Sequence, residues 1–268
     1  MNNEIYIPQT TLLKNAIRSI WQVNDQTFYQ NEIIIPKAVV EIIFDLGEND
    51  PIESNINNKQ FQLAKCFING FNTQPIELEL PRKQFFFAVQ FHPAAIKKCF
   101  GVPASEFANR VIDLTLIDIT FKTLWQQVVE AKTFKERVDI ILKWAENKLI
   151  VTHPREQLLN LFLESHHQHD ISIKDLAKNL CYSPRHLSRK IQESTGMNTE
   201  QALLYKKYLQ SVHLMHTANL SLTAIAYQSN FADQSHFIRT FKTFANITPK
   251  EYSLQKSNLQ GHIYKNVR

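Results

Sequence analysis

The chain has 268 residues, of which 44% are hydrophobic and 21% charged, and its formal net charge is +5 at pH 7. This length is ample for a buried core and fits two domains better than one. The five glycines are widely scattered, which excludes the clustered glycines of phosphate-binding loops and dinucleotide-binding turns. The first residues lack a basic segment followed by an apolar run, and no apolar run is long enough to cross a bilayer. We therefore expect a cytoplasmic protein without a membrane partner.

Short strand-like runs occupy the first part of the chain, and one of them, IELEL, alternates strictly between apolar and polar residues. Polar stretches rich in Asn, Gly and Pro separate the runs, as turns would. The four runs are residues 38–45, 61–68, 76–80 and 85–91. Several short strands joined by polar turns predict an antiparallel sandwich or small barrel.

Two helices are predicted after these strands. Thr133 and Glu136 have the spacing of a capping box, and a helix over residues 121–131 precedes them. Apolar residues then follow at helical spacing: Val138, Ile141, Leu142, Ala145 and Leu149. Such helices can bury their apolar faces against the sheet or against a second copy of the chain, and the sequence leaves both arrangements open.

The first half offers little for catalysis. His92 is its one histidine, and the chain contains no H-E-x-x-H or G-x-S-x-G motif. We therefore expect no catalytic residue, no metal site and no cofactor. The aromatic residues Phe85–Phe87 and Phe91 either line a ligand pocket or belong to the core. A small-molecule-binding or metal-dependent enzyme of the cupin type on this domain is the alternative function.

Charge distinguishes the second half from the first. Residues 1–152 hold 16 Lys and Arg against 17 Asp and Glu, a net of −1. Residues 153–268 hold 14 against 8, a net of +6, and nine of the ten histidines. A basic second half is the part expected to meet a polyanion, although an excess of this size also keeps helical domains soluble.

The second half contains one unit twice. Residues 175–177 align with residues 224–226 at an offset of 49, and beyond the following turn the offset becomes 50. At that offset His186 aligns with His236, and Arg189 aligns with Arg239. A one-residue insertion in the second turn accounts for the change.

Each copy predicts a helix-turn-helix unit. In the first copy Ser183 is an N-cap, Pro184 occupies the first helical position, and Gly196 ends the helix. In the second copy Asp233 and Asn246 take the corresponding places. Another helix begins at the capping box of Thr248 and Glu251, and the basic tail from 256 to 268 is expected to be frayed.

The outer faces of the second helices carry side chains suited to DNA. Arginine pairs with the major-groove edge of guanine, and Ser, Gln and Lys add base or phosphate contacts. A linker helix over residues 200–217 spans roughly 27 Å at about 1.5 Å per residue, which with its flanking turns approaches one DNA turn of about 34 Å. A plain helical bundle with surface arginines is the alternative structure. RNA recognition is disfavoured, because no sheet with exposed aromatic residues for base stacking accompanies the basic half.

These two units resemble the AraC/XylS-type transcription regulators. The resemblance is strongest over residues 225–252 and extends to 175–197, so that it covers roughly residues 154–254. Asn230 and Asn246 stand where the family usually has glycine, and Thr199 stands where many members have proline. The first half, at residues 39–47 and 91–103, is similar to an uncharacterised branch of the family's sensory domains, which are often cupin-like.

The resemblance implies an α+β domain over residues 1–152, with a cupin-like antiparallel sheet or barrel plus helices, for sensing or dimerisation. It implies an all-α domain over residues 153–268 that places two recognition helices in successive major grooves. The implied base-reading residues are Arg185, Ser188, Arg189, Gln234, Ser235, Ile238 and Arg239. Contacts to the DNA backbone are implied for His186, Lys190, His236 and Lys242, with the histidines leaning toward the turns. Its implied partners are promoter DNA and RNA polymerase, with a small-molecule effector and a homodimer left open; it implies no enzyme activity.

Overall fold

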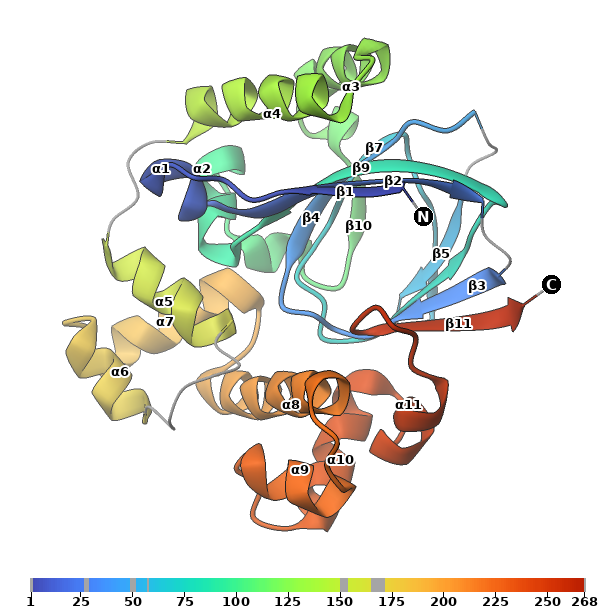
Figure 1. The fold of residues 1–268 in the computed structure, drawn as a ribbon. Coiled ribbons are helices and arrows are strands. Elements are labelled where there is room, and N and C mark those ends of the chain that lie inside the picture. Colours follow the sequence, from blue (N-terminus) through green and yellow to red (C-terminus); the bar gives the residue numbers. More distant parts are fainter. Residues whose placement is uncertain are drawn as a thin grey trace.

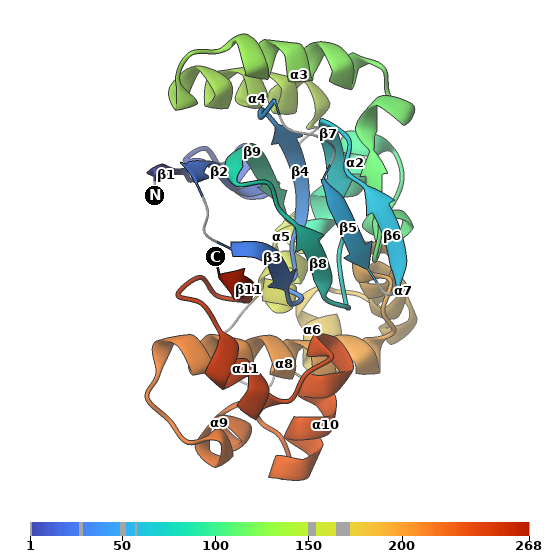
Figure 2. The ribbon, with the colours of Figure 1, turned by 90° about the vertical axis from the view of Figure 1, so that its right-hand side faces the viewer.

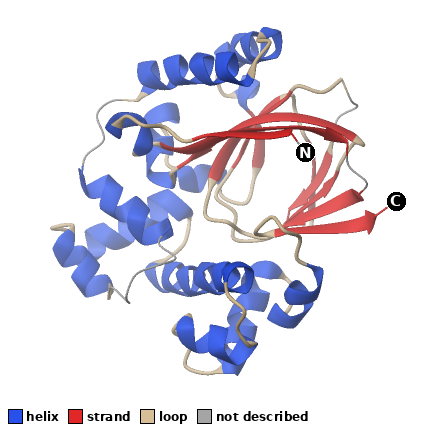
Figure 3. Ribbon diagram, viewed as in Figure 1, coloured by secondary structure: helices blue, strands red, loops and turns tan. Residues whose placement is uncertain are grey.

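A computed structural model describes residues 2–26, 29–48, 52–56, 58–149, 154–164 and 172–267. Two antiparallel sheets lie in one part of the molecule, and helices make up the other part (Figures 1 and 3). This confirms the predicted division into a β-rich domain with additional helices and a helical domain. The predicted boundary between residues 152 and 153 lies outside the described residues.

The two sheets face each other and enclose the interior of the β domain (Figure 2). The six-stranded sheet has the order β1 (Asn2–Tyr6), β2 (Ile17–Gln26), β9 (Lys83–Phe91), β4 (Val40–Asp45), β7 (Cys66–Asn69) and β10 (Val111–Asp113). The five-stranded sheet has the order β11 (His262–Val267), β3 (Tyr29–Ile34), β8 (Ile76–Glu79), β5 (Glu53–Ile56) and β6 (Lys59–Gln62). The sequence run 61–68 is therefore two strands, β6 and β7, in different sheets.

Helices α3 (Thr120–Glu130) and α4 (Phe134–Lys148) cover the outer face of the six-stranded sheet (Figure 1). Phe87 and Phe91 of β9 are fully buried beneath α4, with ring centroids 6.1 Å from Phe134 and 6.3 Å from Trp144. The aromatic strand is thus part of the core on this side, and the apolar faces of the two helices pack inside the domain. The predicted capping box at the start of α4 is confirmed.

The helical part follows in chain order. Its helices are α5 (Pro154–Glu164), α6 (Ile173–Asn179), α7 (Pro184–Thr195), α8 (Thr199–Thr217), α9 (Leu222–Gln228), α10 (Gln234–Ala245) and α11 (Pro249–Gln255). Shorter elements of the β domain are α1 (Thr11–Lys14), α2 (Ile96–Phe100), and the 3₁₀ turns η1 (Pro93–Ala95), η2 (Ala104–Phe107) and η3 (Leu114–Leu116). In the part of the chain that the structure describes, no helix is both long and apolar enough to cross a membrane.

Helix α8 joins the two parts through buried tyrosines. The hydroxyl of Tyr205 accepts a hydrogen bond from the Ala38 amide at 3.1 Å and donates to the Asn72 carbonyl at 3.0 Å. The hydroxyl of Tyr208 donates to the Pro36 carbonyl at 3.4 Å. Burial raises the pKa of the Tyr208 phenol well above its usual range, so this group stays a neutral donor.

The predicted frayed tail is wrong. Residues 262–267 form β11, which pairs antiparallel with β3 and places His262 opposite Ile34 and Tyr264 opposite Glu32. Ile263 of this strand is 1% exposed, and His262 is 8% exposed. The basic composition of the tail suggested a solvated end, but main-chain pairing with β3 makes it a strand of the β domain.

Candidate nucleic-acid interface

The first helix-turn-helix unit consists of α6, a short turn and α7. The Ser172 hydroxyl accepts a hydrogen bond from the Asp175 amide at 3.1 Å, and the Ser183 hydroxyl accepts one from the His186 amide at 3.2 Å. Both caps satisfy amides that a helix start leaves unpaired. Gly196 ends α7 with a φ of 76°, a left-handed conformation that glycine adopts without strain. The predicted N-cap Ser183 and the predicted helix end at Gly196 are confirmed.

The second unit, α9 and α10, repeats this construction. The Asp233 carboxylate accepts a hydrogen bond from the His236 amide at 2.7 Å and caps α10. Asn246 ends α10 with a φ of 58°, and Asn230 takes a φ of 60° in the turn, where the first unit has Cys181 at 52°. Asparagine tolerates this backbone region better than most residues. The departures from glycine at Asn230 and Asn246 therefore leave the turns intact.

The apolar faces of α7 and α10 point inward, as predicted. Leu187 and Ile191 of α7 are fully buried, and so are Phe237 and Phe241 of α10. The ring of Phe241 lies 5.3 Å from Tyr208 in an edge-on contact that fixes α10 on α8. Burial of these faces sets which residues of each helix remain outside.

The side chains predicted to read bases lie on the outer faces of α7 and α10. On α7, Arg185 and Arg189 are exposed and Ser188 is half-buried. On α10, Gln234, Ser235 and Arg239 are exposed and Ile238 is half-buried. The outer face of α7 thus presents two exposed arginines, and that of α10 presents one exposed arginine beside Gln234 and Ser235. Thr223 of α9 donates to the Gln234 side chain at 3.3 Å and orients that amide.

The residues predicted to contact the DNA backbone fall into two groups. His186 and His236 are half-buried at the turns, where His186 stacks on Tyr182 at 4.3 Å and His236 meets Phe231 edge-on at 5.4 Å. These ring contacts agree with a histidine that leans toward its turn. Lys190 and Lys242 extend from later turns of α7 and α10, and Lys242 is exposed.

Glu193 is a charged residue beside the candidate base-reading face that the sequence reasoning missed. Its carboxylate lies 3.2 Å from the Lys190 ammonium, 3.9 Å from the Arg189 guanidinium and 3.7 Å from Lys97 of the β domain. Burial alone would raise its pKa, but the hydrogen bond from Lys190 and the nearby cations outweigh it and lower the pKa overall. Glu193 follows Lys190 by three residues and Arg189 by four, and this spacing in the sequence could have predicted its contacts within the helix.

Helix α8 separates the two units. It has 19 residues, which at about 1.5 Å each give a length of roughly 28 Å. Its first turn is a capping box, in which Asn198 accepts from the Gln201 amide at 2.9 Å and Gln201 accepts from the Asn198 amide at 3.1 Å. The prediction of a single continuous linker helix is confirmed. Within the described ranges, no group of three or more His, Cys, Asp or Glu residues is arranged to hold a metal ion.

Comparison with known proteins agrees with this construction. Residues 176–255 match the family model of a helix-turn-helix domain. The helical part is an AraC-type helix-turn-helix domain. Residues 5–113 match a domain of unknown function, DUF6597.

Relatives of the AraC-type domain are transcription regulators. An uncharacterized HTH-type transcriptional regulator of Staphylococcus aureus (strain MSSA476) is 31% identical over 97 residues, covering 34% of this chain and 12% of that protein. The HTH-type transcriptional activator RhaS of Escherichia coli (strain SE11) is 29% identical over 97 residues, covering 36% of this chain and 35% of RhaS. The structure of ToxT from Vibrio cholerae with bound unsaturated fatty acid is 13% identical, covers 95% of this chain and 99% of ToxT, and superposes with a TM-score of 0.49. The matched part is therefore a minor share of the curated relatives.

Proposed function

We propose that the protein is a sequence-specific DNA-binding transcription regulator. The observation that carries the proposal is the matched presentation of two exposed arginine-bearing helices, α7 and α10, by two capped units on one linker helix. The major groove of B-form DNA is about 12 Å wide and admits one such helix. Two helices held by a linker of this length fit successive major grooves on one side of a duplex.

In this proposal the outer faces of α7 and α10 each recognise one part of the DNA site. Arg185, Ser188 and Arg189 read bases from α7. Gln234, Ser235, Ile238 and Arg239 read bases from α10. Lys190 and Lys242 neutralise phosphates, whereas His186 and His236 shape the turns and reach the DNA backbone. An arginine contributes the most to discrimination because its guanidinium pairs bidentately with guanine.

The β domain, residues 1–152 in the predicted division, serves as the regulatory part in this proposal. It responds to a small-molecule effector or forms a homodimer. RNA polymerase is the partner through which DNA binding changes transcription in the cytoplasm. A polar interior supports sensing: Trp21 and Gln90 both donate to the buried Glu41 carboxylate, at 3.2 and 2.8 Å. The relatives of the helical part are regulators, and they lend no support to an enzyme on the β domain.

Selection of bound sequences from a random pool of duplexes tests this function with the full chain. We expect enrichment of a bipartite site whose halves lie about one helical turn apart. We also expect affinity to fall steeply with salt, because several phosphates are neutralised. Recovery of unenriched sequences, or an affinity that salt leaves unchanged, would contradict the proposal.

A further inference from the structure

Strand β11 links the AraC-type domain to the β domain by main-chain pairing. It follows α11, the last helix of the second unit, and extends the five-stranded sheet along β3 (Figure 1). The pairing continues into the preceding turn, where the Ile35 amide donates to the Gly261 carbonyl at 2.9 Å. The second helix-turn-helix unit is therefore held by a strand of a sheet that otherwise belongs to the β domain.

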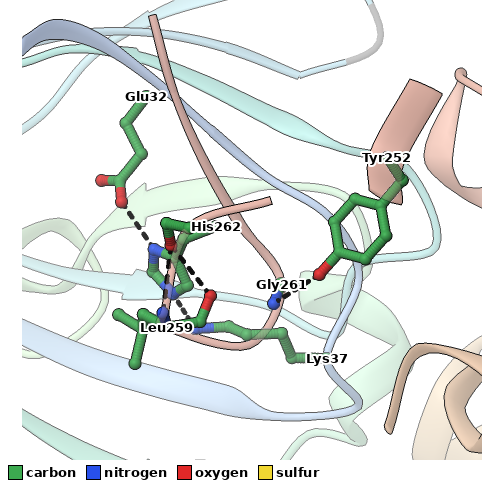
Figure 4. A network of polar contacts seen from close by, with 7 residues as sticks. Glu32, Lys37, Tyr252, Leu259, Gly261 and His262 are labelled. Atoms are coloured by element: carbon green, nitrogen blue, oxygen red, sulfur yellow. Dashed lines mark hydrogen bonds and ion pairs between the residues drawn. The ribbon is translucent and has the colours of Figure 1, made fainter. Parts of the chain in front are cut away.

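The inner face of β11 completes a buried polar cluster between the sheets (Figure 4). Nδ1 of His262 lies 2.5 Å from the Glu32 carboxylate, and its Nε2 lies 3.3 Å from the Lys37 ammonium. Burial, and then the charge of Lys37, lower the pKa of this imidazole below its usual value. A neutral ring that donates from Nδ1 to the Glu32 carboxylate and accepts from the Lys37 ammonium at Nε2 pairs both of its nitrogens.

The outer face of β11 contacts the second unit. Ile263 is buried, and together with Ile33 it lines a groove of about 200 Å³ whose other wall includes Ala245 and Asn246 at the end of α10. The Tyr252 hydroxyl of α11 accepts a hydrogen bond from the Gly261 amide at 3.0 Å, at the turn that leads into β11 (Figure 4). Both faces of the strand are therefore occupied, one by each part of the molecule.

In this structure the end of α10 lies against a loop of the β domain. Gln74 donates to the Thr243 carbonyl near the end of α10 at 3.2 Å. Arg239 lines a groove of about 350 Å³ that it shares with Thr73 and Gln74 of the β domain. A duplex that approaches Arg239 from this side meets the β-domain loop that forms the other wall.

We propose that β11 is an intramolecular latch that holds the AraC-type domain in a closed state and restrains its binding to DNA. The proposal rests on the proposed DNA-binding function. Release of β11 from β3 removes one tie of the second unit to the β domain and leaves the tyrosines of α8 as another, so that opening beside Arg239 costs less while the helices keep their own core. If about nine-tenths of the molecules are latched, release tightens the apparent affinity by about tenfold.

A matched pair of variants opens the latch or leaves it closed. Ile263→Asp forces a carboxylate into a buried apolar site and expels the strand. Leu254→Asp makes the same change of charge on α11, at a side chain that is 79% exposed, and is the control. Hydrogen exchange reports release through faster exchange of the β3 amides, with the amides of α7 and α10 still protected. Affinity is measured on a fluorescent pool of random duplexes of about 30 base pairs, three helical turns.

A reversible lock tests the same latch from the other side. Asn31 and Lys265 are directly opposite in the β3–β11 ladder and neither is buried. Paired cysteines at these two positions, in a chain whose exposed Cys181 is replaced by Ser, are at a separation that a disulfide spans. Oxidation holds the latch closed and reduction restores its opening, so the same protein serves as its own control if Ile263→Asp also unfolds α10.

The outcomes separate the latch from the proposed function. We expect Ile263→Asp to bind DNA about tenfold more tightly than Leu254→Asp, and the oxidised lock to bind more weakly than its reduced form. Equal or weaker binding after release, with α7 and α10 protected, overturns the latch and leaves DNA binding standing. A dimer formed by exchange of β11 also overturns an intramolecular latch. Failure of every form, including the released one, to bind duplex DNA contradicts the proposed function itself.

Discussion

Replacement of Arg189 by alanine tests base recognition by α7 directly. The Arg189 side chain is 67% exposed, and its 3.9 Å contact with Glu193 joins residues four apart on one helix. Such a surface pair is worth about 0.3–0.5 kcal/mol, so the guanidinium is released for DNA at small cost. A bidentate pair with guanine is worth about 1–3 kcal/mol, which corresponds to roughly 5- to 150-fold in affinity. We therefore expect Arg189→Ala to weaken binding to the selected site by a factor in this range and to relax preference at one position.

The assay compares the selected site with random duplex over a series of salt concentrations. Lys190→Ala is the contrasting variant, because loss of a phosphate contact weakens both duplexes alike and lowers the salt slope by about one. Arg189→Ala should instead weaken binding mainly to the selected site. Equal losses on both duplexes for Arg189→Ala would refute base reading by this side chain.

Three further predictions concern stability, each measured by urea unfolding of the full chain. Gly196→Ala should lower the free energy of unfolding by about 1–2 kcal/mol, because a residue with a Cβ is strained at the φ of 76° found there. Asn246→Gly should leave the free energy of unfolding unchanged or raise it. Equal effects of the two substitutions would contradict the role of left-handed backbone. Phe237→Ala should cost about 3–5 kcal/mol because the ring is fully buried, and a cost below about 1 kcal/mol would contradict its place in the core. Burial, and then the charge of Lys256, lower the pKa of His216 from 6.5 to about 4. The unfolded chain binds the proton more readily, so stability should be full above pH 6.5 and fall as the pH drops toward 4; a flat profile in that interval would contradict this.

The parts of the fold that the sequence predicted best are those that depend on neighbours in the chain. Ser183, Asp233 and Gly196 act within one helical turn, and their caps are visible in the spacing of residue types. The outward arginines follow from the same local periodicity, because burial of Leu187 leaves the opposite face outside. The candidate interface was therefore largely predictable from short-range patterns.

The parts that the sequence did not reveal depend on partners far along the chain. Strand β2 has an irregular mixture of polar and apolar residues, and its place between β1 and β9 comes from pairing across the sheet. The contact of Glu193 with Lys97 joins two domains, and no spacing within α7 indicates it. The ladder of β11 on β3 brings together segments some 230 residues apart, as the contact between His262 and Glu32 shows. A tail with a basic composition and few apolar residues gives no local sign of such a partner.

The place of β11 has a consequence for synthesis on the ribosome. Strand β3 emerges before the helical part, yet the strand that covers its edge is translated only after both helix-turn-helix units. Until then β3 presents unpaired main-chain groups that another nascent chain can pair with. Completion of the five-stranded sheet therefore waits until the helices from α5 to α11 have been made, because β11 follows them in the chain.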